Sequence, residues 1–103
     1  MSRSAVLAPR ALRELEKATQ WIANDNPLAA RALRAAVATA AQLIAEHPLA
    51  GRRRPELAKD PYRFVTLSGF PYVLVYNASK TPPVIVRVVH AARDLSDALR
   101  SRN

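Results

Sequence analysis

Three runs of β-branched and aromatic residues in the second half of the chain predict strands. These runs cover residues 62–67, 71–76 and 84–90. Ser68 and Gly69 predict a tight turn between the first two strands, and a longer connection from Asn77 to Pro83 precedes the third. Connections this short favour an antiparallel meander.

The first half of the chain carries apolar residues at helical spacing instead. One amphipathic helix is expected from Pro9 to Asn24, with an apolar side formed by Leu12, Leu15, Ala18 and Ile22. Asn26 and Pro27 provide a cap and a first helical residue for a second helix that runs to about Glu46. Its inward stripe is expected to be Leu33, Val37, Ala40 and Ile44.

A small sheet with one apolar face needs a cover, and the two helices are the segment available to provide it. The predicted fold is therefore α+β: a helical hairpin packed on a small antiparallel sheet, in one domain that spans residues 1–103. Residues Ser4–Leu7 are expected to add a short first strand, at an edge of the sheet. Asp94 is expected to cap a short final helix.

The period of two in the last strand predicts which side chains meet the helices. Its all-apolar side should pack on the helices, with Val86 and Val88 against the second helix; the residues sharing this side are Val84, Val86, Val88 and His90. The opposite side carries Ile85, Arg87 and Val89. Arg87 is therefore expected on the open face of the sheet.

The charge of the chain narrows the class of partner. The formal net charge is +8 and the pI is near 11.1, and residues 51–103 hold ten Lys and Arg against four Asp and Glu. A surface this basic suits nucleic acid, an anionic membrane or an acidic protein. No segment reads as a signal peptide or reaches membrane-spanning length, so a cytoplasmic protein is expected, without a membrane partner.

Few residues could support catalysis or ligand binding of a familiar kind. The chain has no cysteine, and its only histidines, His47 and His90, stand in different elements without metal-ligand spacing. With two glycines, Gly51 and Gly69, it has no phosphate-binding glycine loop. We expect no metal site, no cofactor and no catalytic residue set.

A basic set interleaved with aromatic residues remains as the candidate site. Its cations are Arg52, Arg53, Arg54, Arg63, Arg87 and Arg93, and its aromatic and imidazole members are Tyr62, Tyr72, Tyr76 and His90. Such residues could hold RNA, because guanidinium groups bind phosphates and rings stack on bases. Against this, Tyr72 and Tyr76 also fit core positions, His90 also fits a hydrogen-bonded buried site, and residues 52–54 also fit a solvated loop.

The order of these features resembles the RelE/ParE superfamily of toxins from type II toxin–antitoxin systems. The resemblance covers nearly the whole chain and rests on five features: Asn26-Pro27, Pro48 to Arg52, Arg63, Tyr72 to Tyr76, and Val88 to Asp94. It implies the fold already predicted and a toxin that is neutralised by a small antitoxin.

Within that superfamily, the chain looks closer to the ParE branch. Toxins of the RelE branch cleave messenger RNA with basic residues on the open sheet face, including an arginine just after the first tyrosine of the middle strand and a tyrosine near the C-terminus. The matching strand position here is Val73, the last nine residues contain no tyrosine, and only Arg93 has a counterpart. ParE toxins, by the same resemblance, inhibit DNA gyrase and need no catalytic residues.

The resemblance also implies a partner and leaves two alternatives. The partner is a ParD-like antitoxin whose acidic C-terminal tail covers the hairpin and sheet in a hetero-oligomer, and the candidate contacts are Trp21, Tyr72, Tyr76 and Arg87. Candidates for target or phosphate binding are Arg52, Arg53, Arg54, Arg63, Arg87, His90 and Arg93. The alternatives are a ribosome-dependent endoribonuclease and a small basic nucleic-acid-binding domain.

Overall fold

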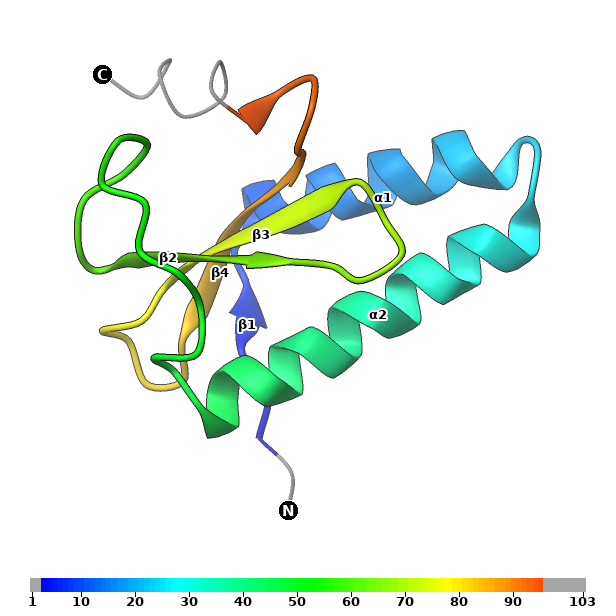
Figure 1. Cartoon of the computed structure of the whole chain (residues 1–103). Coiled ribbons are helices and arrows are strands. Elements are labelled where there is room, and N and C mark those ends of the chain that lie inside the picture. Colours follow the sequence, from blue (N-terminus) through cyan, green and yellow to red (C-terminus); the bar gives the residue numbers. More distant parts are fainter. Residues whose placement is uncertain (1–2, 96–103) are drawn as a thin grey trace.

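The structure, a computed structural model, describes residues 3–95 as two helices packed on a four-stranded mixed sheet (Figure 1). The elements are β1 (Val6–Leu7), α1 (Pro9–Ala23), α2 (Pro27–Glu46), β2 (Tyr62–Thr66), β3 (Tyr72–Asn77) and β4 (Val84–His90). The strands lie in the order β1-β4-β3-β2. Figure 1 shows the hairpin of α1 and α2 extending past the end of the sheet.

The predicted strands and their connections are confirmed. β2, β3 and β4 pair in an antiparallel manner. Gly69 provides a φ of +82° in the turn after β2, a conformation that favours glycine. The first strand lies at the sheet edge as predicted, but only Val6–Leu7 pair, and they run parallel to β4. The predicted final helix lies mostly on residues 96–103, outside the described residues.

Both helices begin and end close to the predicted positions. The Asn26 side chain caps α2 by accepting a 3.0 Å hydrogen bond from the backbone N–H of Ala29. The predicted inward stripe of α2, namely Leu33, Val37, Ala40 and Ile44, is buried. In α1, however, Leu12 is 45% exposed and Ala11 is fully buried in its place, because the buried side of α1 follows Ala11, Leu15, Ala18 and Thr19.

By length and composition alone, α2 is long and apolar enough to cross a membrane. The expectation that no segment reaches that length is therefore wrong. In this fold the apolar stripe of α2 belongs to the main hydrophobic core, and the core helix of a globular domain passes the same test.

The main core lies between the helices and one face of the sheet. On the sheet side it contains Leu74 and Tyr76 from β3 and Ile85 and Val88 from β4. Val75 pairs with Arg87 while Tyr76 pairs with Ile85, so Val86 is an extra residue in a β-bulge. The bulge reverses the expected alternation: Ile85 faces the helices, whereas Val86 packs on the other side.

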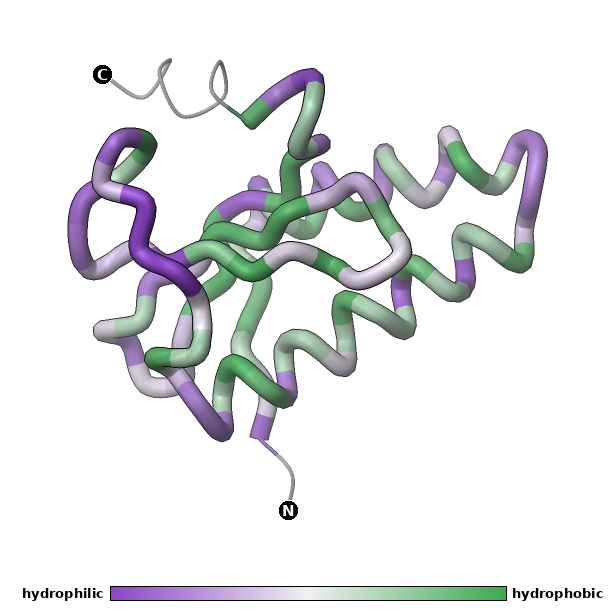
Figure 2. Tube along the Cα trace, viewed as in Figure 1, coloured by the Kyte–Doolittle hydropathy of each residue, from purple (hydrophilic) through white to green (hydrophobic). Residues whose placement is uncertain are grey.

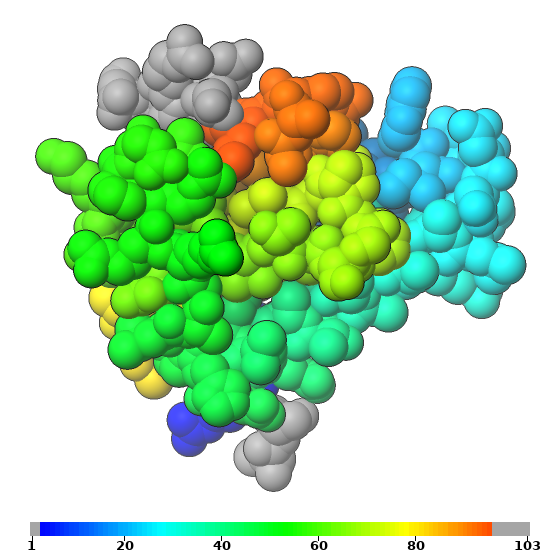
Figure 3. Space-filling view, in the orientation of Figure 1, coloured from blue at the N-terminus to red at the C-terminus, as the bar shows by residue number. Residues whose placement is uncertain are grey.

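A second apolar cluster covers the opposite face of the sheet. This outer-face cluster consists of Phe64, Val73, Val75, Val89 and Leu95, with Leu57, Ala58, Tyr62 and Val86 packed against it. Two segments cover that face: the loop of residues 52–61 and the segment after β4. They are green and orange in Figure 3, and Figure 2 shows that the loop is mostly hydrophilic with a short hydrophobic stretch.

Candidate interaction groove

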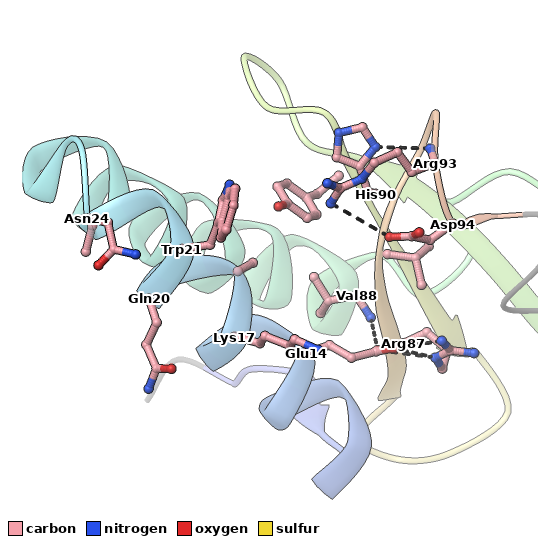
Figure 4. Close-up of a pocket in the computed structure, with 14 residues that line it drawn as sticks. Glu14, Lys17, Gln20, Trp21, Asn24, Arg87, Val88, His90, Arg93 and Asp94 are labelled. Carbon is pink, nitrogen blue, oxygen red and sulfur yellow. Dashed lines mark hydrogen bonds and ion pairs between the residues drawn. The ribbon is translucent and has the colours of Figure 1, made fainter.

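A groove of about 1050 Å³ lies between α1 and the C-terminal end of β4 (Figure 4). α1 supplies Lys17, Gln20 and Trp21 to one wall, and His90, Arg93 and Asp94 stand on the other side. The remaining lining residues are Glu14, Ala18, Ala23, Asn24, Tyr72, Arg87, Val88 and Val89. The groove therefore combines aromatic, cationic and amide side chains.

Glu14 and Arg87 form a buried ion pair at one end of the groove. The Arg87 guanidinium donates to Glu14 Oε2 from Nη2 at 2.7 Å and from Nε at 2.9 Å. Arg87 is only 5% exposed. Arg87 pairs with Val75 of the outer-face cluster and precedes the core residue Val88, so it lies on the predicted side of β4. That side is not open at Arg87, however, because the side chain is buried and bound to Glu14 of α1.

The Glu14 carboxylate also binds a backbone N–H at the edge of β4, where no neighbouring strand pairs within residues 3–95. β1 pairs with Val84 and Ile85, and the backbone N–H of Ala8 donates to the Ile85 carbonyl, after which α1 begins. Beyond that point Glu14 Oε1 accepts a 2.8 Å hydrogen bond from the backbone N–H of Val88. A side chain thus takes the place of a neighbouring strand at this edge.

Trp21 and Lys17 are two of the exposed residues in the helical wall. Trp21 is 72% exposed, which is unusual for the largest side chain in a small domain. Lys17 stands four residues earlier, so the two side chains share one side of α1. The contact of Trp21 with an antitoxin stays a prediction.

His90 and Tyr72 form the opposite wall. Their rings meet edge to face with centroids 5.4 Å apart. His90 Nδ1 accepts hydrogen bonds from the backbone N–H groups of Ala92, at 3.3 Å, and Arg93, at 3.2 Å. This geometry assigns the proton of neutral His90 to Nε2. Beside it Arg93 lies 3.9 Å from Asp94 in an exposed ion pair.

Tyr76 lies outside the groove and stabilises the loop after α2. It is fully buried, and its hydroxyl donates to the Pro48 carbonyl at 2.6 Å and accepts from the Gly51 N–H at 2.9 Å. Burial raises the pKa of this hydroxyl, against a smaller opposite effect of the Gly51 hydrogen bond and the Arg63 charge. Arg63 donates to the carbonyls of Leu49, at 3.2 Å, and Gly51, at 2.9 Å.

The three adjacent arginines occupy an exposed loop away from the groove. Arg52 pairs with Phe64 through its backbone, Arg53 lies 3.1 Å from Asp60, and Arg54 lies 3.0 Å from Glu56. A backbone hydrogen bond within Glu56 and the Arg54 side chain lower the pKa of that carboxyl. Exposed pairs of this kind are weak, so the loop keeps its cationic character.

The structure divides the predicted site residues into three groups. The groove brings together Trp21, Tyr72, Arg87, His90 and Arg93. Arg63 and Tyr76 hold the loop after α2, and residues 52–54 form a separate cationic loop. Sequence reasoning missed Glu14 and Lys17 as groove residues, although the spacing of Lys17 and Trp21 was a usable signal. Among residues 3–95, no group of three or more His, Asp and Glu could hold a metal ion.

A basic hairpin-on-sheet domain with this groove has the architecture of the small toxins of toxin–antitoxin systems. The fold matches a chain of the chromosomal ParDE system from P. aeruginosa, with a TM-score of 0.69 and 16% sequence identity, over 86% of this chain and 96% of that chain. Residues 5–95 match the family described as ParE toxin of type II toxin-antitoxin system, parDE. The chain belongs to the ParE toxin family, and the predicted superfamily and fold class are confirmed.

Two curated relatives agree with that family. Toxin RelE3 of Caulobacter vibrioides is 33% identical over 89 residues, which cover 86% of this chain and 95% of the relative. Y4kP of Sinorhizobium fredii is 35% identical over 82 residues, which cover 80% of this chain and 81% of the relative. The chain is thus a type II toxin, while the names ParE and RelE point to different branches of the superfamily.

Proposed function

We propose that this toxin inhibits DNA gyrase in the cytoplasm and is held inactive by a cognate ParD-like antitoxin. The observation that supports this target most directly is the apolar outer face of the sheet. A RelE-like ribonuclease would place its phosphate-binding cations there. At the strand position where that branch carries an arginine, this chain has Val73, which is 5% exposed within the outer-face cluster.

Two of the cations that could replace the phosphate-binding residues of a RelE-like ribonuclease are already bound to other groups of this protein. The alternative ribonuclease would use Arg63, Arg87 and Arg93 for phosphates and His90 for proton transfer. Arg87 is bound to Glu14, and Arg63 donates to two loop carbonyls. Arg93 and His90 remain near each other, which is too small a set for efficient cleavage, because each missing group usually costs orders of magnitude in rate.

The net charge and the groove of this toxin suit the binding of an acidic antitoxin tail. The toxin has a net charge of +8, and the groove presents the exposed Trp21 and Lys17 and is also lined by Tyr72. A disordered acidic segment that folds on binding could cover the hairpin and the groove together and form a hetero-oligomer. Tyr76 is fully buried and offers no surface for such a contact.

Two reactions with the purified toxin test the target. Supercoiling of relaxed plasmid by gyrase should be inhibited, and messenger RNA on translating ribosomes should stay intact. Addition of the cognate antitoxin should restore supercoiling. Codon-dependent cleavage of messenger RNA, with gyrase unaffected, would replace this proposal with the ribonuclease.

Arg93 is the cation whose removal separates target binding from folding. Arg93→Ala should weaken growth inhibition in a bacterial host while the melting temperature changes little, since its ion pair with Asp94 is exposed. Arg53→Ala is the matched control, because Arg53 is also paired and exposed but lies outside the groove. Equal growth inhibition by both variants and the unmodified toxin would remove Arg93 from the contact surface.

A further inference from the structure

The α1 wall of the groove is polar and aromatic rather than aliphatic. From Lys17 to Asn24 it lines the groove with one cation, two side-chain amides, two alanines and Trp21. Leu15, the nearby leucine of α1, is buried in the core. An apolar helix would find few partners on this wall. A flat ring, by contrast, would find an exposed indole face beside amide groups that can bond to base edges.

The charges around Trp21 are arranged for an anionic chain. Lys17 stands four residues before Trp21 on α1, and Arg93 stands on the opposite wall (Figure 4). Of the two groove carboxylates, Glu14 is already paired with the buried Arg87, while Asp94 is exposed and only loosely paired with Arg93. The Arg93 pair is 3.9 Å long and exposed, so a phosphate could compete for that guanidinium.

We propose that this groove binds single-stranded nucleic acid, with a base stacked on Trp21 and flanking phosphates held by Lys17 and Arg93. His90 Nε2–H adds a donor on the second wall. An exposed aromatic ring within a cationic groove is the arrangement that proteins use to bind single strands without strong sequence preference. The net charge of +8 supplies attraction over longer distances. This binding does not depend on gyrase being the target.

The single tryptophan of the chain makes the proposal directly measurable. Titration of the purified toxin with an oligo(dT) strand of about twelve nucleotides, a length within the usual site sizes, should quench Trp21 fluorescence in a saturable way. An oligo(rU) strand of equal length, run in parallel, distinguishes DNA from RNA as the preferred strand. Absence of quenching by both strands would overturn the proposal.

Variants are compared by the anisotropy of the same strand carrying a fluorescent label. Trp21→Ala should weaken binding about tenfold, the usual size of one lost stacking contact. Leu28→Ala is the matched control, because Leu28 is 74% exposed on the hairpin and does not line the groove. Equal affinities of Trp21→Ala and the unmodified toxin would contradict stacking at Trp21.

The phosphate contacts are tested through the salt dependence. Lys17→Ala should reduce the slope of log affinity against log salt by about 0.7, the value for one released phosphate contact on a single strand. Lys80→Ala removes an equal charge from the exposed loop before β4, and its slope should stay unchanged. An equal loss in both variants would mean diffuse attraction to the net charge. Equally strong competition by polyglutamate would mean that the groove binds any anionic chain without stacking a base, and either result would overturn the proposal.

Discussion

The Glu14 carboxylate lies 2.7 Å from Nη2 of Arg87 and accepts a 2.8 Å hydrogen bond from the backbone N–H of Val88. One side chain of α1 thus pairs with a buried cation and accepts a hydrogen bond from the edge of β4. The two contacts fix α1 against the strand that it covers. They also explain how an arginine can be 5% exposed in the middle of an apolar strand.

Replacement of Glu14 should be strongly destabilising. Glu14→Ala leaves the buried Arg87 charge without this partner and the Val88 N–H without its acceptor. We expect a loss of about 3 kcal/mol in the free energy of unfolding, at the low end for a broken buried pair because the Glu14 side chain is 23% exposed. Urea unfolding measures it. The control, Arg10→Ala, breaks an exposed pair at 4.0 Å and should cost less than about 1 kcal/mol. Similar losses in both variants would show that the buried pair contributes little.

The Tyr76 hydroxyl should contribute more to stability than the hydroxyl of Tyr72, another buried tyrosine. Tyr76→Phe leaves the buried Gly51 N–H without an acceptor and the Pro48 carbonyl without its donor, which should cost about 1–3 kcal/mol. Tyr72 is 8% exposed and its hydroxyl makes no hydrogen bond within the described residues, so Tyr72→Phe is the matched control. Thermal unfolding should rank Tyr76→Phe well below the control, and the reverse order would refute this role of Tyr76.

Stability at alkaline pH should carry a contribution from the same hydroxyl. Burial raises the pKa of Tyr76 above its usual value of 10.0. The folded state therefore keeps a proton that the unfolded state loses, and the contribution is fully present below about pH 10 and declines as pH rises toward the folded pKa. The difference in unfolding free energy between the unmodified toxin and Tyr76→Phe should be constant up to about pH 9 and shrink between about pH 10 and pH 11. A difference that is constant over this range would contradict the raised pKa.

Elements with a strong local pattern could be predicted from the sequence. The Asn26 cap and the stripe from Leu33 to Ile44 need only local spacing, and both are confirmed. The sides of Ile85 and Val86 could not be predicted, because a bulge at Val86 changes which residues share a side and leaves no mark on the apolar run of residues 84–86. The prediction that Leu12 faces the core was wrong for a similar reason. A shift of one residue along α1 decides which apolar side chain is buried.

The candidate site was predicted by residue type more readily than by position. The sequence named Trp21, Tyr72, His90 and Arg93 as candidates but did not predict that they line one groove. The roles of Tyr76 and Arg63 depend on contacts with the loop after α2, which are 12 to 28 residues away in the sequence. Glu14, which pairs with Arg87, is 73 residues away. Sequence spacing alone does not reveal contacts at such separations.

The glycine in the loop after α2 should tolerate no side chain. A Cβ at Gly51 would lie 2.7 Å from both Cε1 and the hydroxyl oxygen of the fully buried Tyr76, which has no room to move. Gly51→Ala should therefore cost about 2 kcal/mol or more. At Gly69 a Cβ meets no atom within 4 Å, but the φ of +82° adds strain, so Gly69→Ala should cost about 1 kcal/mol. Equal melting temperatures for the two variants would show that the loop relaxes around the methyl group.

Because of the bulge in β4, substitutions at Ile85 should destabilise the fold more than substitutions at Val86, whereas strict alternation would predict the opposite. Ile85 is fully buried in the main core, whereas Val86 is half-buried against the outer-face cluster. Ile85→Ala should cost about 3–4 kcal/mol, and Val86→Ala about 1 kcal/mol, because only the first leaves a cavity between helices and sheet. The aspartate variants should differ more clearly. Ile85→Asp buries an unpaired charge and should prevent folding. Val86→Asp should keep the near-ultraviolet circular dichroism of the folded toxin and a cooperative urea transition. Unfolding of Val86→Asp together with tolerance of Ile85→Asp would restore strict alternation and place Val86 against the helices.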